Sequence, residues 1–224
     1  SMDEPATEDI RAVMLSPIIF KAIGNPRQPA LRQALAELKT WVRAGGHRRD
    51  LTSRPPDQLG HDQYTPAIEL MDAWWPKLLQ AEFQPMLGTD GMNAVKKLVD
   101  FGGTDFAEGW YGYVSKDLRR VFGLGRELGP YSQAYCGSLP GHRFSLRALR
   151  RRCRGALQAS LAAARNVTPQ QIYGSPKQCQ GKPGPACSDA NTWVEASAIT
   201  IPPFPYQNRP TFQQVVTLTR HVPR

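Results

Sequence analysis

The stretch S-L-R-A-L-R-R-R-C-R-G-A-L-Q-A-S-L-A-A-A-R, residues 145–165, is the most regular part of this sequence. Its apolar side chains recur every three or four residues, which is the spacing of one face of an α-helix. That face consists of Leu146, Leu149, Cys153, Leu157 and Leu161. Most of the arginines fall outside it, so the stretch predicts a helix with one buried face and one solvated, basic face.

Two further helices are expected before residue 47. Thr7 can cap the first, and the acidic residues Glu8 and Asp9 suit the positive end of its dipole. Its expected buried stripe is Ile10, Val13, Met14 and Ile18, and Asn25-Pro26 ends it. The second helix spans residues 29–44, with Leu31, Leu35, Leu38 and Val42 on one face and Gly45-Gly46 at its end.

Residues 47–64 have the composition of a loop, and Thr65-Pro66 opens the next helix. Its broad apolar face includes Trp74 and Trp75, which we interpret as core residues because indole rings bury so much surface. Pro76 lacks an amide hydrogen, so a kink or a break is expected there. A turn at Gly88–Gly91 and another helix over about residues 105–122 follow.

The end of the chain has a different pattern. Thr168-Pro169-Gln170-Gln171 predicts a short, capped helical turn. Trp193–Ile201 and Thr211–Thr219 are rich in β-branched and aromatic residues, and a proline-rich turn separates them, so both are predicted to be strands. The expected fold class is mainly α with a C-terminal pair of β-strands (α+β). We divide the chain into a linker or cloning remnant (1–6), a helical region (7–130) and a disulfide-stapled helix with the strand pair (131–224), forming one compact unit.

The charge is strongly positive, since Lys and Arg number 28 against 19 for Asp and Glu, a formal net charge of +9. A polyanionic partner, solubility or an acidic remainder of a larger protein would each explain it. The basic residues look dispersed except for one run, Arg147–Arg154. That run lacks interleaved aromatic residues, so a solvated helix face is favoured over a nucleic-acid contact. The sequence contains no stretch of 18 or more apolar residues, and no membrane partner is expected.

The four cysteines lie in the second half of the chain without C-x-x-C spacing, which argues against a zinc ribbon or a thioredoxin-type pair. Two disulfides are the preferred interpretation, and three pairings are possible. Cys136 with Cys153 and Cys179 with Cys187 is favoured because it closes short loops across Gly/Pro-rich segments. The alternative is four buried free thiols. Disulfides would imply export from the cytosol.

Catalytic patterns are scarce. The histidines, His47, His61, His142 and His221, show no metal-ligand spacing, and no G-x-S-x-G elbow occurs. Carboxylate pairs such as Asp50 with Asp62, or Glu69 with Asp72, could occur in any protein of this size, and no role is assigned to them. We expect no cofactor and no metal.

Several segments follow one another in a recognisable order. They are W-V-R-A-G-G-H-R-R-D (41–50), A-I-E-L-M-D-A-W-W-P (67–76), F-A-E-G-W-Y-G-Y-V-S-K-D-L-R (106–119), Y-C-G (135–137) and P-P-F-P-Y-Q-N-R-P-T-F-Q-Q-V-V-T-L-T (202–219). Together they resemble the C-terminal portion of secreted actinobacterial members of the penicillin acylase (penicillin amidase) family. Similar proteins carry paired cysteines near the Y-C-G segment and before the terminal strands.

The resemblance implies an N-terminal nucleophile hydrolase, whose intact form has an αββα architecture. Such an enzyme hydrolyses a linear N-acyl amide, such as a β-lactam side chain or an acyl-homoserine lactone. Self-cleavage exposes a serine that attacks the carbonyl, its own α-amino group is the base, and an asparagine stabilises the oxyanion. The family's nucleophile and oxyanion motifs lie upstream of the matching part. Ser1 is followed by Met2-Asp3-Glu4, which does not match the start of the family's catalytic chain, so Ser1 is not expected to be the nucleophile. Neither Asn25 nor Asn208 lies in the matching motif, so neither is expected to be the oxyanion residue.

The chain is therefore expected to be the C-terminal portion of a secreted or extracytoplasmic amidohydrolase, inactive alone. Its expected partners are the upstream α chain and the catalytic part of the β chain, with an N-acyl small molecule as substrate of the whole. The family's acidic turn after H-R-R-D is replaced here by L-T-S-R-P-P-D-Q-L-G-H-D-Q, so no metal ligand is carried over. The alternatives are a free-standing, non-catalytic binding domain and, less favoured, a basic nucleic-acid-binding protein.

Overall fold

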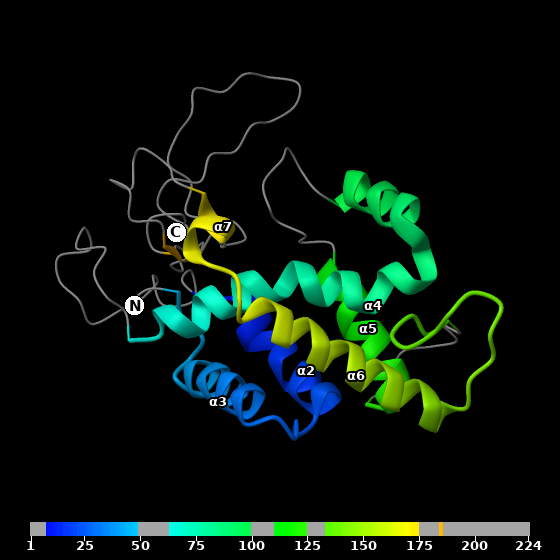
Figure 1. Ribbon diagram of the computed structural model, residues 1–224, viewed down its shortest axis with the longest axis horizontal. Helices are drawn as coiled ribbons and strands as arrows, with labels where there is room; N and C mark the ends of the chain where they lie inside the picture. Colours follow the sequence, from blue (N-terminus) through cyan, green and yellow to red (C-terminus); the bar gives the residue numbers. More distant parts are fainter. Residues whose placement is uncertain (1–7, 49–62, 100–109, 125–132, 175–183, 186–224) are drawn as a thin grey trace, which may run out of the picture.

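The computed structural model describes residues 8–48, 63–99, 110–124, 133–174 and 184–185, and this part of the chain is mostly helical (Figure 1). A π-helical turn precedes six α-helices. In chain order the elements are η1 (Arg11–Leu15), α2 (Ser16–Ile23), α3 (Pro29–Arg43), α4 (Thr65–Val99), α5 (Trp110–Phe122), α6 (Leu146–Ala164) and α7 (Pro169–Tyr173). The mainly α prediction is confirmed for these residues. Both predicted strands lie outside them.

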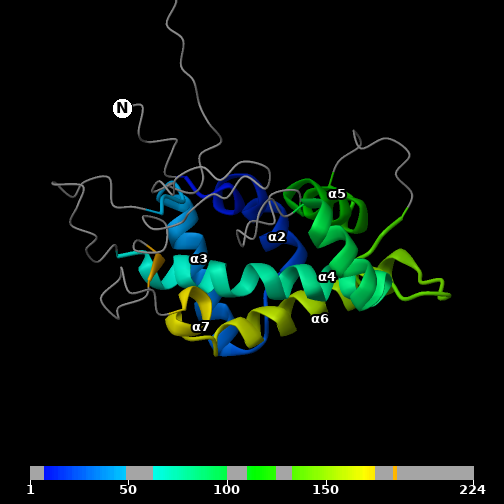
Figure 2. The same ribbon diagram turned by 90° about the horizontal axis from the view of Figure 1, so that it is seen from above.

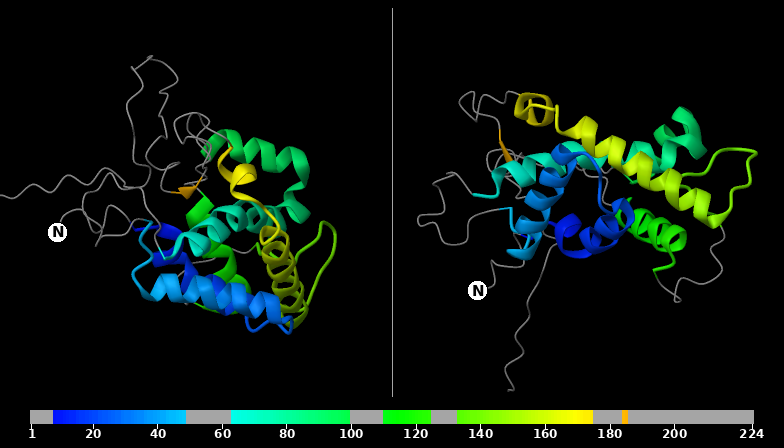
Figure 3. Two further views of the ribbon diagram at one scale, coloured as in Figure 1. Left: turned by 60° about the vertical axis from the view of Figure 1, so that its left-hand side comes forward. Right: turned by 60° about the horizontal axis from the view of Figure 1, so that its bottom comes forward.

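Helices α4 and α6 run side by side through the middle of the molecule (Figures 1 and 2). Helix α2 packs on α6 and α5, while α3 packs on α4 (Figure 3). The short α7 returns to α4 near its N-terminal end. None of the described helices is both long enough and apolar enough to cross a membrane.

One apolar core joins these helices. Trp41 of α3, Trp74 of α4 and Trp110 of α5 are its largest fully buried side chains. Cys153, Leu157 and Leu161 of α6 are also completely buried, as their spacing predicts, whereas Leu146 at the helix start is 48% exposed. Trp75 is buried beside Trp74, so the interpretation of the double tryptophan as core is confirmed.

The N-terminal helix buries only part of the predicted stripe: Ile18 is buried and Ile10 half-buried, but the prediction is wrong for Val13 and Met14. Val13 is 44% exposed and Met14 is 64% exposed, while Ala12 and Leu15 are buried. The cause is the π-helical turn, because it widens the helix by about one residue per turn and shifts every later side chain around the axis. In α2 the core face is then formed by Ile18, Ile19, Ala22 and Ile23.

Helix α4 passes through Pro76 without leaving helical dihedral angles, so of the two predicted alternatives the break is wrong, and a kink at that residue stays a prediction. The interruption lies at Gly88, with φ 66° and ψ 178°. Burial of Trp74, Trp75 and Leu78 around Pro76 holds this turn in place although one backbone hydrogen bond is missing. The positive φ at Gly88 is one that glycine adopts readily, and it falls within the predicted Gly88–Gly91 turn.

Candidate functional site

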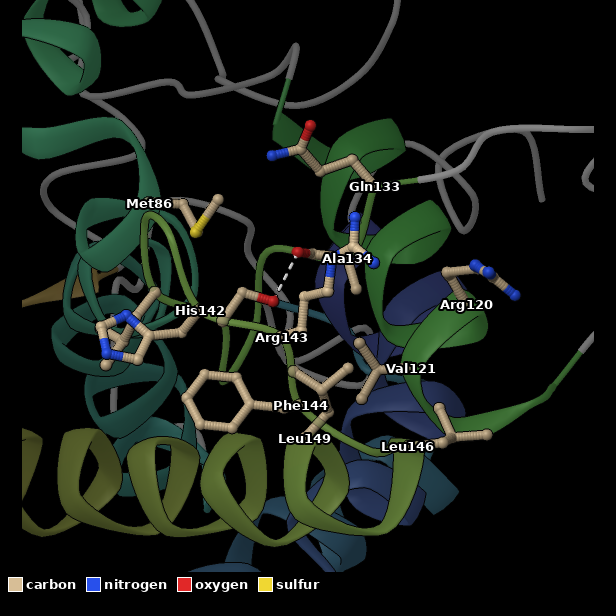
Figure 4. A pocket seen from close by; sticks show the side chains of 12 residues that line it. Met86, Arg120, Val121, Gln133, Ala134, His142, Arg143, Phe144, Leu146 and Leu149 are labelled. Carbon is tan, nitrogen blue, oxygen red and sulfur yellow. Dashed lines mark hydrogen bonds between the residues drawn. The ribbon is translucent and has the colours of Figure 1, made fainter.

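A pocket of about 590 Å³ opens where α4, α5, the loop before α6 and the start of α6 meet (Figure 4). Its floor is apolar, and its wall is built by residues 133–144, which form no helix or strand. The lining consists of Met86, Arg120, Val121, Gln133, Ala134, Ser138, Leu139, His142, Arg143, Phe144, Leu146 and Leu149. This set contains two arginines, one histidine and no acidic residue.

The polar groups of the wall differ in what they bond. The Ser138 hydroxyl donates to the Ala134 carbonyl at 2.7 Å, the dashed line in Figure 4. His142 pairs through Nδ1 with the Pro140 carbonyl at 2.9 Å, and its ring stacks on Phe144. Arg143 extends through the middle of the view in Figure 4, whereas Arg120 lies at its edge and points away. The wall therefore offers the Arg143 guanidinium beside an apolar floor.

A disulfide fastens this wall to α6. Cys136 and Cys153 are bonded, with Cα atoms 4.9 Å apart, which is the pairing favoured from the sequence. Gly137 has φ 83°, and a Cβ there would lie 2.6 Å from the Leu149 carbonyl oxygen. Only glycine fits such a close approach of loop to helix. Cys179 and Cys187 lie outside the described residues.

Two side chains hold the same loop from opposite sides. Asp117 of α5 accepts the backbone amides of Tyr135 at 2.7 Å and of Cys136 at 2.8 Å. Arg152 of α6 donates through Nε to the Gly137 carbonyl at 2.7 Å, and its guanidinium lies over the Phe144 ring. A loop without regular structure is thus fixed by a covalent bond and three hydrogen bonds.

Behind the loop lies a buried pair of acids, Glu82 of α4 and Asp117 of α5. Glu82 is completely buried, and neither carboxyl oxygen has a well-aligned hydrogen-bond partner. Its burial, and then the nearby Asp117 carboxylate, raise the pKa of Glu82 well above its ordinary value. Burial also raises the pKa of Asp117, although the two backbone amides and Glu82 act in the opposite direction. The pair therefore favours a protonated Glu82 beside a charged Asp117.

A second polar group, which we call the charge cluster, joins the buried Asp9, Arg11 and Arg48 to the partly buried Asp72 and Tyr173. Arg11 donates to both Asp9 oxygens and to Asp72, the latter at 2.5 Å. Arg48 contacts Asp9 at 3.0 Å and forms a two-pronged pair with Asp72, at 3.0 and 2.8 Å. The Tyr173 hydroxyl donates to Asp72 at 2.7 Å. The cluster ties the chain's beginning and the segment after α3 to α4 and α7.

The electrostatics of this cluster are those of matched opposite charges. Burial acts to lower the pKa of Arg11, but attraction to Asp9 and Asp72 outweighs it, and the net shift is upward. Asp9 and Arg11 are 0% and 3% exposed. Such groups must be paired to remain charged inside a protein. The cluster is a structural clamp between the chain's beginning, the segment after α3, α4 and α7.

Two arginines of α6, on the face predicted to be solvated, form hydrogen bonds to neighbouring helices. Arg150 donates through Nε to the Val121 carbonyl near the end of α5, and Arg154 likewise to the Ala22 carbonyl near the end of α2. Both carbonyls belong to the last turns of helices, which carry partial negative charge. The basic face of α6 thus stabilises the ends of two neighbouring helices.

Sequence reasoning missed the role of Asp72, to which it assigned none. The signal was present, because Asp72 follows Met71 inside an apolar stretch and an unpaired acid there would be costly. His47 contributes its backbone carbonyl to the Trp41 indole at 2.7 Å, and His142 lies at the pocket. His61, His221, Asp50 and Asp62 lie outside the described residues. Over the described ranges, no group of three His, Cys, Asp or Glu residues could hold a metal ion.

Comparison with known proteins found no matching family model, no matching curated protein and no matching solved structure.

Proposed function

We propose that this chain is the C-terminal part of a penicillin-acylase-like hydrolase that cleaves a linear N-acyl amide. The observation that carries the proposal is the ordered series of resembling segments, ending in Q-N-R-P-T-F-Q-Q-V-V at residues 207–216. In this proposal, the chain gives the enzyme a rigid helical unit, while the nucleophilic serine and the oxyanion asparagine belong to the upstream part.

The locations of the segments support a structural role. Arg48 of the first segment and Asp72 of the second meet in the charge cluster. Asp117 of the third segment holds the amide of Cys136, in the fourth. Residues that carry the resemblance thus pair with one another across the fold, as expected of groups that maintain a scaffold and do not touch a substrate. An extracytoplasmic location is part of the proposal, and the Cys136–Cys153 disulfide is compatible with it.

The test begins with the coding region upstream, which should contain, in frame, a segment starting with a catalytic serine. The 224-residue chain and its Ser1→Ala variant should both fail to hydrolyse phenylacetyl-, penicillin- and acyl-homoserine-lactone substrates. Joined to the upstream segment, the chain should be processed and should turn over at least one of them. Hydrolysis by the chain alone that is lost in Ser1→Ala, or the absence of an upstream serine segment, would overturn the proposal.

A free-standing binding domain is the second candidate, favoured by the pocket between α4, α5 and α6. An independent domain should unfold in one cooperative transition and should bind a small molecule without any upstream chain. If the isolated chain is instead largely unfolded and becomes ordered only with the upstream segment, the second candidate is excluded.

A further inference from the structure

We propose that the pocket bounded by Met86, Val121, Arg143 and Phe144 binds a small organic anion, namely a carboxylate on an aromatic or short aliphatic body. This site is separate from the proposed hydrolase chemistry, and neither depends on the other. Its volume of about 590 Å³ lies within the range of small-molecule sites.

Charge is the first argument. Among the described residues from 118 onward there are nine arginines and no Asp or Glu, whereas the described residues up to 117 hold 11 Lys and Arg against 8 Asp and Glu. Within the described residues, the excess of positive charge therefore lies in the segments that form most of the pocket. Helix α6 alone carries five arginines and no acid. The resulting field attracts anions to this face.

The second argument is that the cations of the lining are available. All four ion pairs found within the described residues belong to the charge cluster, so Arg120 and Arg143 take part in none of them. Arg150, Arg152 and Arg154, in contrast, are fixed to backbone carbonyls. A guanidinium group presents two parallel N–H donors that match the oxygens of a carboxylate. Arg143, which lines the pocket and lies near the middle of the view in Figure 4, is the expected anchor.

The floor supplies the third argument. Val121 is completely buried at the base of the pocket, whereas Leu146 is 48% exposed and Leu149 and Phe144 are partly exposed. The Phe144 ring contacts the Arg152 guanidinium, 4.6 Å from its centroid, and stacks with the His142 ring, 5.9 Å away. An inorganic anion would leave this apolar surface in water, whereas an aromatic or aliphatic body would cover it. The preferred ligand therefore combines a carboxylate with an apolar body.

The part of the wall between the lining residues Ala134 and Ser138 is also formed in advance of binding. Residues 135–137 are held by the Cys136–Cys153 disulfide, by two bonds to Asp117 and by one from Arg152. A wall that is already ordered loses little conformational entropy when a ligand binds. Nucleic acid is less favoured as the occupant, because the aromatic rings near these arginines, Phe122 and Phe144, already lie against Arg154 and Arg152.

The experiment is a titration of the oxidised 224-residue chain, followed by calorimetry and by ligand-observed NMR. Octanoate and phenylacetate are the probes, octanamide and phenylacetamide are their neutral counterparts, and acetate is the anion without an apolar body. We expect the two carboxylates to bind at least tenfold more tightly than their amides, and acetate to show no binding. Equal binding of acids and amides would overturn the proposal.

Variants locate the site. Arg143→Gln should weaken binding at least tenfold, and Arg120→Gln should weaken it less. Arg151→Gln, on the exposed face of α6 and outside the lining, is the matched control and should bind as the parent does. Ala134→Phe should block the pocket, and its unfolding temperature shows whether the fold persists. Equal losses of affinity in Arg143→Gln and Arg151→Gln would overturn the proposal, and so would full binding by a folded Ala134→Phe. Displacement of octanoate by a single-stranded oligonucleotide at equal charge concentration would also overturn it.

Discussion

Two carboxyl groups of helix α4, the partly buried Asp72 and the completely buried Glu82, have opposite surroundings. Asp72 accepts hydrogen bonds from Arg11, Arg48 and Tyr173. Glu82 faces another acid, Asp117, and has no well-aligned donor. A buried acid can remain in an apolar interior by meeting cations or by keeping its proton, and this helix uses both solutions.

The difference predicts different sensitivities. The charge cluster needs every member, because removing one ion leaves a buried opposite charge without its partner. The acid pair needs a proton, so pH acts on it directly. Mutations of Asp72 should therefore destabilise the chain strongly, whereas mutations of Glu82 should mainly change how stability depends on pH.

Asp72→Asn should have the largest effect. The amide keeps the shape of the side chain but removes the negative charge, so Arg11 and Arg48 are left to share Asp9. Loss of one member of a buried ion pair costs about 3–5 kcal/mol. Urea unfolding of both proteins, followed by circular dichroism, measures the difference. Asp90→Asn, an exposed position on the same helix, should change stability by less than about 0.5 kcal/mol. Equal stability of the two variants would show that the cluster is not a clamp.

Asp117→Asn should be next in size, because it replaces the acceptor of two amide groups in the loop before α6. An amide oxygen is a weaker acceptor than a carboxylate, and its NH₂ group cannot accept the second amide. We expect a loss of about 2–3 kcal/mol. Hydrogen exchange at the amides of Tyr135 and Cys136 should accelerate more than exchange in α3. Unchanged protection of both amides would contradict the assigned bonds.

The helices were predictable because their signals are local. The spacing of Leu149, Cys153, Leu157 and Leu161 is enough to define the buried face of α6, and the Cys153 position on that face made its bridge to Cys136 reasonable. The π-helical turn was not predictable, because Val13 and Met14 are apolar and exposed only through a shift in register.

The charge cluster and the pocket depend on contacts between distant residues. Arg48 and Asp72 are 24 positions apart, and Asp72 and Tyr173 are 101 apart. Nothing in the spacing of either residue specifies its partner, since only the packing of α3, α4 and α7 brings them together. The pocket likewise combines Met86, Val121 and Phe144 from three separate segments.

Glu82→Gln tests the contrast between Asp72 and Glu82 through the pH dependence of stability. The pKa of Glu82 is raised on folding, so the folded state holds more protons than the unfolded state above the ordinary value of 4.5. The contribution of Glu82 to stability is thus complete below that pH and is lost as the pH rises toward its folded pKa. Glutamine does not titrate, and the variant should lose this slope. Its unfolding temperature should exceed that of the parent by about 2–4 °C at pH 8, equivalent to about 1 kcal/mol.

Thermal unfolding from pH 4 to pH 9 tests this, with the exposed Glu37→Gln on α3 as the control that should keep the parent's slope. An unchanged slope in Glu82→Gln would mean that Glu82 does not hold its proton.

Tyr173→Phe should give the smallest loss of stability. It distinguishes the contribution of the cluster's charged groups from that of its neutral hydroxyl. The phenol donates to an Asp72 oxygen that already receives Arg48, so its loss leaves the carboxylate paired. Removal of one such bond at a partly exposed position costs about 0.5–1 kcal/mol. Because Phe retains the ring, packing of α7 on α4 should persist, and urea unfolding should shift in midpoint but not in slope. If Tyr173→Phe instead matched Asp72→Asn in cost, the cluster would depend on the hydroxyl and not on opposite charges, and its contrast with Glu82 would no longer hold.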